Sequence, residues 1–488
     1  MQTGFAFLQA GSVRSKNMTS ILYANIMNAT VGCLAYWACG YAFAFGNGNG
    51  FIGNENFFLS NTDLRDRELV RWFLEYACAI TVATIVNGAM AERMNVKCYL
   101  IFSFYCTGWM QPLVAHWTWY ERGWLHDGVV VVSHTNTTVR YEDYAGSSVI
   151  HVVGGVASLV GAALIGSRHG YFDESGNRIK ILESTTSMTV LGGFIIAFSF
   201  FALNLAAHGR LAETDDAAVY GLIVVNCMLA VASGSITTMA YERHRETKEF
   251  RQWRIAKAIH GCLVGLVAIS AGSSSVYPYE AFCIGGVAGV VYVHATEGIK
   301  KWGVDDPVNA IAIHLGGGLW GVLAVSFLDQ NHGLLYKGNR ASLVLIAWNV
   351  GGVLLIILWT LVWSSFLFGI LTCLDILRIS PDTESKGLDR LVHGEKSYPG
   401  VQGKPLTCQV ESSVTAHLIL NLSGPNHHRT DDAKAVPLAA PLSEERMRRK
   451  IKMAIQVSRQ DSHDDELVEN EVKFTEAVAF DGMEESAV

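Results

Sequence analysis

The sequence predicts an all-α membrane protein followed by a polar C-terminal tail, on three observations: composition, long apolar runs and uneven charge. Half of the 488 residues are hydrophobic and only 17% are charged, with a mean hydropathy of +0.26. Soluble domains carry about 25% charged residues. Residues 1–376 hold 48 charged side chains, and the last 112 positions hold 33. This pattern excludes a secreted disulfide scaffold, a disordered chain and an ordinary cytosolic enzyme, and it gives no support for nucleic-acid binding.

The apolar runs set the number of membrane spans. An α-helix needs about 20 apolar residues to cross a hydrocarbon core of about 30 Å. Residues 1–13 would reach only about 20 Å, and they lack the basic start and cleavage site of a signal peptide. We interpret them as the second half of a first span whose beginning is absent from this chain. Ten further segments are long enough to cross: 18–46, 72–92, 97–120, 144–167, 187–207, 217–240, 255–275, 278–299, 307–328 and 342–375.

Basic residues in the loops predict the orientation. Alternate loops hold 15 Lys and Arg on one side and 8 on the other, and the richer side faces the cytoplasm. The richer set includes Arg14 and the run 243–257, so the C-terminal tail is expected in the cytoplasm. Asn136 begins a glycosylation acceptor pattern in an outward loop.

Cysteine usage predicts neither a metal site nor a disulfide framework. Nine of the ten cysteines lie within or beside apolar runs, and no C-x-x-C pair occurs. We interpret them as small apolar residues buried among helices.

Two spans share a pattern at a spacing of 163 residues. Asp143 precedes His151 by eight residues, Asp306 precedes His314 by eight, and a Gly pair follows each histidine at the same offset. Aspartate suits a helix N-cap, and eight residues of helix rise about 12 Å, which places both imidazoles near the bilayer midplane. The loop count makes the two spans enter from opposite sides, as expected for inverted repeats.

Histidines at this depth are costly and usually functional. Neutral imidazole accepts a hydrogen bond and relays a proton, whereas a bare ion entering such a passage meets a barrier on the order of 20 kcal/mol. Ammonium can leave its proton behind and cross as ammonia. The same residues would also suit water or CO₂. The alternative is two unrelated core histidines bonded to neighbouring helices, as we expect for His260 and His294.

Several further motifs follow in a fixed order along residues 4–399. With these and both Asp-x7-His segments, the chain resembles the ammonium transporters (the ammonium transporter/methylammonium permease/Rhesus superfamily), and it is closer to the ammonium transporter branch. The motifs are 11–17 (GSVRSKN), 40–46 (GYAFAFG), 91–93 (AER), 116–119 (HWTW), 377–380 (LRIS) and 393–398 (HGEKSY).

The resemblance implies a fold of eleven helices in two inverted five-helix repeats, with the first helix truncated in this chain. It also implies a plasma-membrane homotrimer with one pore per subunit, ammonium or ammonia as substrate, methylammonium as analogue, and no cofactor. His151 and His314 fall on the family's paired pore histidines. Asp143 falls on the aspartate near the outer recruitment site, and Trp119 on the tryptophan that receives ammonium by cation–π attraction.

Some positions depart from the family pattern. Cys78 and Leu203 replace the two gate phenylalanines, Ala207 replaces the recruitment-site serine, and Glu75 stands where relatives often carry glutamine. We expect weaker π-based recruitment, partly offset by the Glu75 charge, and a looser outer gate. The alternative role for Glu75 is a partner for Arg71.

The tail divides into two expected parts. Residues 377–399 resemble the family's proximal cytoplasmic regulatory tail, and residues 400–488 are expected to be largely disordered. Within them, Ser443–Val457 has the spacing of a basic amphipathic helix, and the tail is a candidate site for a cytoplasmic regulator. The leading function is ammonium transport. The alternatives are an ammonium sensor of the same fold with low flux, and a Rhesus-type NH₃/CO₂ channel.

Overall fold

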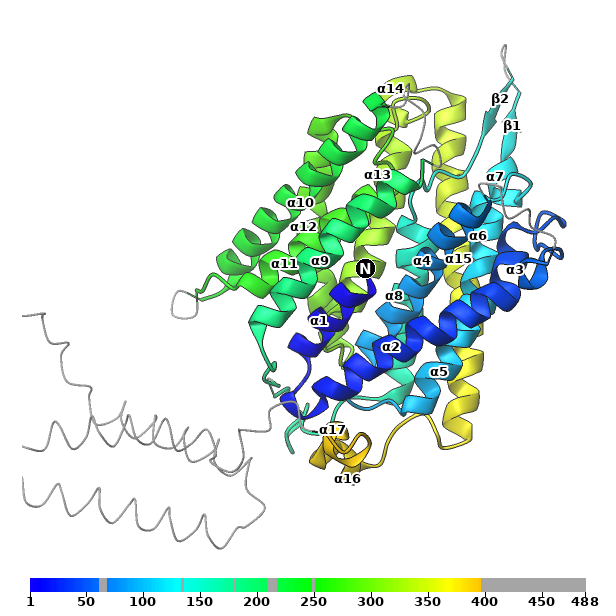
Figure 1. Cartoon of the computed structure of the whole chain (residues 1–488). Helices are drawn as coiled ribbons and strands as arrows, with labels where there is room; N and C mark the ends of the chain where they lie inside the picture. The colour runs from blue at the N-terminus through cyan, green and yellow to red at the C-terminus, as the bar shows by residue number, and fades with distance from the viewer. Residues whose placement is uncertain (61–67, 133–135, 180, 209–216, 248–250, 396–488) are drawn as a thin grey trace, which may run out of the picture. The chain divides into compact units, whose positions relative to one another are not determined.

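The computed structural model describes residues 1–60, 68–132, 136–179, 181–208, 217–247 and 251–395 (Figure 1). They belong to one unit, Met1–Ser397. The expected disordered segment 400–488, with its candidate basic helix, lies outside the described residues.

Most of the described chain is helical. The α-helices are α1 (Gln2–Ser12), α2 (Met18–Ala35), α3 (Tyr41–Phe45), α4 (Glu68–Ala89), α5 (Val96–Tyr105), α6 (Gln111–Trp119), α7 (Trp124–Asp127), α8 (Val153–Ile165), α9 (Thr186–Ala206), α10 (Ala217–Arg245), α11 (Ile255–Ile269), α12 (Pro278–Lys301), α13 (Gly317–Leu328), α14 (Leu334–Lys337), α15 (Arg340–Cys373), α16 (Pro381–Lys386) and α17 (Leu388–Leu391). Short 3₁₀ or π-helical turns are η1 (Ser15–Asn17), η2 (Tyr36–Gly40), η3 (Phe57–Leu59), η4 (Cys106–Met110), η5 (Ser147–Val152) and η7 (Ile311–Gly316).

Among the described residues, eight helices are long and apolar enough to cross a membrane. They coincide with eight of the ten predicted full-length spans. Of the other two, residues 97–120 correspond to the uninterrupted helical run α5–η4–α6, and residues 255–275 to the 15-residue helix α11. The prediction of an α-helical membrane protein is confirmed, while the count of eleven helices stays a prediction.

One small sheet departs from the all-α expectation. Strands β1 (Val129–Val131) and β2 (Thr137–Val139) pair antiparallel, with Val129 opposite Val139. Both strands are rich in β-branched residues, which favour a pleated surface. Val131 and Val139 pack against Leu345 of α15, so the hairpin is anchored to a long membrane helix.

The two histidine-bearing segments cross at close range because glycines line the crossing. α8 packs against α4, α15 and η7 (Figure 1). A Cβ at Gly155 would lie 2.7 Å from the Leu315 Cβ, and one at Gly318 would lie 3.2 Å from the Val152 nitrogen. Small residues allow such close helix contacts in membranes, so the repeated Gly pairs noted in the sequence have a packing role.

The end of the described chain folds back onto the first loop. The Asp389 carboxylate accepts hydrogen bonds from the backbone N–H groups of Thr19 (3.0 Å) and Ser20 (2.8 Å). The backbone N–H of Leu388 donates to the Asn17 side chain (2.9 Å). A carboxylate suits this place because the first N–H groups of α2 have no partner within the helix.

Candidate functional site

The structure brings the two predicted histidines into direct contact. The Nδ1 atoms of His151 and His314 lie 3.0 Å apart, and the ring centroids lie 5.0 Å apart at 16°. Both side chains are buried, with exposed fractions of 0% and 4%. Two ring nitrogens at this distance form a hydrogen bond when one ring carries a proton on Nδ1 and the other does not, an arrangement that two neutral imidazoles of different tautomer provide.

A histidine nitrogen without a hydrogen bond and two phenylalanine rings lie beside this imidazole pair. The His151 Nε2 has no hydrogen-bond partner among the described residues. The Phe200 ring lies 5.1 Å from the His151 ring, and the Phe5 ring lies 6.4 Å from the His314 ring. The sequence analysis missed both phenylalanines. The signal for Phe200 was its position three residues before Leu203, on the same face of α9.

Each histidine lies in a π-helical turn, η5 for His151 and η7 for His314. Such turns are rare and frequently occur at functional sites. An aspartate carboxylate accepts backbone N–H groups at the start of each segment. For Asp306 the donors are Val308 (3.3 Å) and Ile311 (2.8 Å). The prediction that both aspartates act as caps agrees with these bonds.

Asp143 makes the fuller set of capping bonds. Its carboxylate accepts from the backbone N–H groups of Gly146 (3.1 Å), Ser148 (2.8 Å) and Val149 (3.1 Å), and from the Ser148 hydroxyl (2.5 Å). All four donors belong to the segment that carries His151. The carboxylate therefore orders the start of η5.

Trp119 lies beside this cap. Its indole N–H donates to the backbone carbonyl of Asp143 (2.8 Å), and Arg71 donates to the carbonyl of Trp119 (3.4 Å). The structure thus joins two residues predicted for the recruitment site, one on α6 and one just before η5.

Glu75 and Cys78 lie one turn apart on α4, and both are buried, with exposed fractions of 8% and 4%. The Glu75 Oε2 has no hydrogen-bond partner among the described residues. The Arg71 guanidinium lies 4.0 Å from the centroid of the Phe45 ring. Arg71 is thus engaged by Phe45 and by the carbonyl of Trp119, while a buried carboxylate oxygen remains unpaired.

The other two predicted gate positions lie near the end of α9. Leu203 is buried, and Ala207 follows the last residue of the helix. Neither side chain has a polar atom, so a hydroxyl acceptor is lacking at both positions.

Of the two histidines expected in the core, His260 is buried, whereas His294 is exposed, so the core assignment of His294 is wrong, although both rings contact a tyrosine hydroxyl. The His260 Nδ1 lies 2.8 Å from the Tyr292 hydroxyl, and the His294 Nε2 lies 3.0 Å from the Tyr241 hydroxyl. Among the described residues, no group of three or more His, Cys, Asp or Glu side chains could hold a metal ion.

The fold and this centre define a multi-span α-helical membrane protein with a buried imidazole pair. The Ammonium Transporter Family model matches residues 1–398, and the chain belongs to that family. It is 33% identical over 417 residues to the putative ammonium transporter 1 of Caenorhabditis elegans, covering 82% of this chain and 76% of the relative. It is 34% identical over 423 residues to ammonium transporter 1 member 3 of Solanum lycopersicum, covering 82% and 90%. These relatives are named transporters, not enzymes.

Solved structures show the same fold. A sensor Amt protein superposes with a TM-score of 0.72 at 28% identity, covering 80% of this chain and 93% of that one. Candida albicans Mep2 superposes with a TM-score of 0.68 at 22% identity, covering 83% and 90%.

Proposed function

We propose that this chain transports ammonium by recruiting NH₄⁺ at an outer vestibule, removing its proton and passing NH₃ along His151 and His314. The observation that carries the proposal is the 3.0 Å contact between two buried Nδ1 atoms. Paired neutral imidazoles offer hydrogen bonds to ammonia in a passage whose low dielectric excludes Na⁺ and K⁺. Two adjacent imidazoles also resist double protonation, because a second positive charge beside the first is unfavourable.

Uptake of labelled methylammonium by cells that lack their own ammonium transporters tests the proposal. The wild type should show saturable uptake, and H151A and H314A should lose most of it at equal membrane abundance. H260N is a matched control, because His260 is also buried and bonded but lies outside the imidazole pair. Full uptake by H151A and H314A, or none by the wild type, would refute the proposal.

Glu75 adds a proposed electrostatic contribution to recruitment. Glu75 lies one helical turn from Arg71, which donates to the Trp119 carbonyl, and in its ionised form the unpaired buried oxygen would add a negative charge on this side of Trp119, whose indole face attracts ammonium by about 0.5–2 kcal/mol. E75Q should therefore raise the apparent KM several-fold at little change in maximal rate. E121Q is the control, since Glu121 is an exposed acidic residue two positions after Trp119. An unchanged KM for E75Q would contradict this role.

An ammonium sensor with low flux is the second candidate. Similarity to the sensor Amt protein favours it, as do Cys78 and Leu203 at the gate positions. Purified protein that binds methylammonium while vesicles containing it take up none would establish the sensor and exclude the transporter.

The proposed setting is a homotrimer in the plasma membrane with a cytoplasmic C-terminus that a regulator could bind. Large apolar side chains on α9 support an embedded or subunit-facing surface: Phe194 and Phe198 are 61% and 76% exposed in the single chain. Crosslinking in native membranes tests the trimer, and protease access to the tail in sealed cells tests its side.

A further inference from the structure

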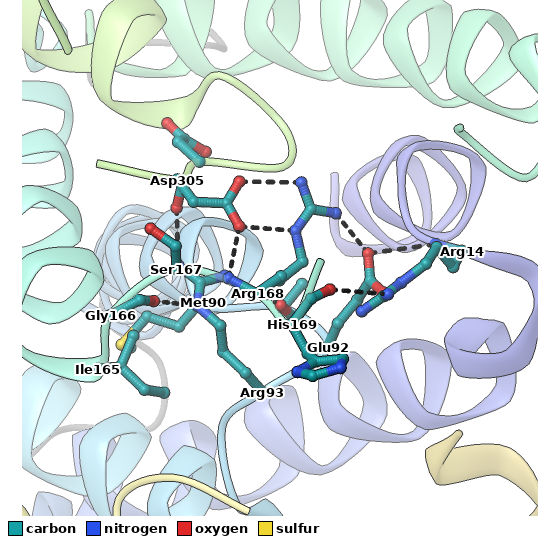
Figure 2. A network of polar contacts seen from close by, with 12 residues as sticks. Arg14, Met90, Glu92, Arg93, Ile165, Gly166, Ser167, Arg168, His169 and Asp305 are labelled. Carbon is teal, nitrogen blue, oxygen red and sulfur yellow. Dashed lines mark hydrogen bonds and ion pairs between the residues drawn. The ribbon is translucent and has the colours of Figure 1, made fainter. Parts of the chain in front are cut away.

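A network of buried charges joins the segment after α8 to the segment before η7 (Figure 2). Arg168 is its centre. The guanidinium donates to both carboxylate oxygens of Asp305, with Nε–Oδ2 of 2.8 Å and Nη2–Oδ1 of 2.9 Å, and the backbone N–H of Arg168 also donates to Oδ2 at 2.9 Å. The third guanidinium nitrogen, Nη1, donates to Glu92 Oε1 at 2.5 Å. Arg168 thus bonds two carboxylates at once.

The second arginine of the network, Arg93, reinforces the same junction. Its Nη2 donates to the backbone carbonyl of Asp305 at 2.6 Å, and its Nε donates to the carbonyl of Gly166 at 2.7 Å. Arg93 and Arg168 therefore span the same gap through different atoms. One binds main-chain carbonyls, and the other binds carboxylates.

Glu92 is tied to its place from several directions. Its carboxylate accepts from the Arg14 backbone N–H at 3.2 Å and from the Arg14 guanidinium (Figure 2). It also accepts from the Asn17 side chain at 2.8 Å. Its backbone has φ of +75°, in the left-handed region that non-glycine residues rarely adopt. These bonds hold Glu92 in that conformation, and its Oε1 accepts from both the Arg14 backbone N–H and the Arg168 guanidinium.

Opposite charges in the network stabilise one another. Burial alone would raise the pKa of Glu92, but the guanidinium groups of Arg168 and Arg14 outweigh it and hold the pKa below its usual range. Burial likewise opposes ionisation of Asp305, and its bonds with Arg168 lower its pKa overall. Glu92, Asp305 and Arg168 are therefore charged at neutral pH, and the bonds between them have the strength of charge-assisted pairs.

The network lies at the ends of the two segments that carry the paired histidines. Arg168 follows the last residue of α8, Ile165, by three positions, and α8 continues directly from the turn that holds His151. Asp305 immediately precedes Asp306, the cap of the segment that holds His314. A bidentate Arg–carboxylate pair fixes both distance and orientation, so it ties the end of the α8 segment to the start of the η7 segment.

We propose that the Arg168–Asp305 pair, supported by Glu92, is a positioning device that holds α8 and η7 at the spacing where His151 and His314 share a proton. It rests on the proposed function for its consequence in transport, but its effect on the imidazole pair is independent of transport. Lysine cannot replace Arg168, because a single ammonium cannot bind Asp305 in two places and reach Glu92 at the same time.

The test compares R168K and D305E with R245Q in full-length protein. Arg245 also makes an ion pair with a carboxylate, Glu297, at 2.7 Å, but it joins α10 to α12, which carry neither histidine. In lipid vesicles, ¹⁵N NMR of histidine-labelled protein reports the Nδ1–H···Nδ1 bond, and H314Q identifies its signal. Methylammonium uptake gives KM and maximal rate on the same samples.

R168K and D305E should fold, and their shared-proton NMR signal should be lost or shifted. Their maximal rate should fall about tenfold or more while KM changes less than twofold, because misplacement of about 1 Å can cost 10²-fold in rate. R245Q should match the wild type. An unaltered signal and rate per folded molecule in R168K and D305E would overturn the proposal. So would complete loss of folded protein in both with R245Q intact, because the pair would then serve stability alone. A wild type without uptake would refute the proposed function, while the NMR signal would still decide the positioning role.

Discussion

Removing the Asp143 carboxylate should destabilise the protein far more than neutralising it. In D143A all four bonds to the side chain are lost, and the buried N–H groups of Gly146, Ser148 and Val149 remain without that acceptor. An unsatisfied buried donor costs about 1–3 kcal/mol, so the three donors in D143A should cost about 3–9 kcal/mol of unfolding free energy.

Asparagine preserves most of this cap. With its oxygen facing Ser148 and Val149, D143N keeps three of the four bonds and places its amide group against the Gly146 N–H. The expected loss is one bond, about 1–3 kcal/mol. D143N should therefore be more stable than D143A by the cost of two donors, about 2–6 kcal/mol.

Equilibrium unfolding in mixed SDS micelles measures the two losses, and methylammonium uptake measures apparent KM. If Asp143 acts by ordering η5, D143N should keep its KM within about threefold, while D143A loses uptake together with stability. The reasoning is refuted if the two variants are equally stable, or if D143N raises KM as strongly as D143A, since the charge itself would then contact the substrate.

Three further predictions concern other parts of the site. Burial raises the pKa of Glu142 to about 7, so the folded chain holds a proton that the unfolded chain releases above about pH 4.3, and stability should fall as pH rises towards 7. Between pH 5 and 7.5, E142Q should reduce the loss of unfolding free energy by about 1–2 kcal/mol relative to the wild type. An equal loss in both proteins would show that Glu142 does not cause this pH dependence. W119F should lose the 2.8 Å indole bond and about 1 kcal/mol of stability, but it should keep its KM because an aromatic ring remains. W119A should raise KM about twofold to thirtyfold in uptake assays. Equal KM values for the two variants would exclude recruitment by the ring. G155A should lower the free energy of unfolding by about 1–3 kcal/mol, because the new Cβ would lie 2.7 Å from a side-chain carbon of η7. G369A should unfold like the wild type, because there is open space around Gly369. Equal losses in the two variants would show that the crossing is loosely packed.

Features carried by one segment were predictable from sequence. The Asp-x7-His pattern located the capping carboxylates Asp143 and Asp306, because capping depends on neighbours along the chain, while the predicted depth of each histidine stays a prediction. The hairpin was missed although its signal, the β-branched run at Val129, was present. A short amphipathic hairpin leaves little trace in an analysis that searches for long apolar runs.

Contacts between distant segments were not predictable in the same way. Arg168 and Asp305 are 137 positions apart, and each read separately is a charged loop residue. Phe200 lies on the Leu203 face of α9, but the sequence does not show that this face meets His151. Whether such side chains meet depends on the crossing angles and separations of helices, and these follow from packing over the whole bundle rather than from local pattern.

The amino-acid order alone determined that this chain lies in a membrane and which helical segments carry the two imidazoles, since hydrophobic length acts within one helix, while the depth of each imidazole in the bilayer stays a prediction. Only the tertiary structure decided that His151 and His314 approach to 3.0 Å and that buried arginines join the ends of their segments. That approach depends on glycine-lined crossings and charge pairs between segments more than 100 residues apart, which acquire their free energy only after the helices assemble.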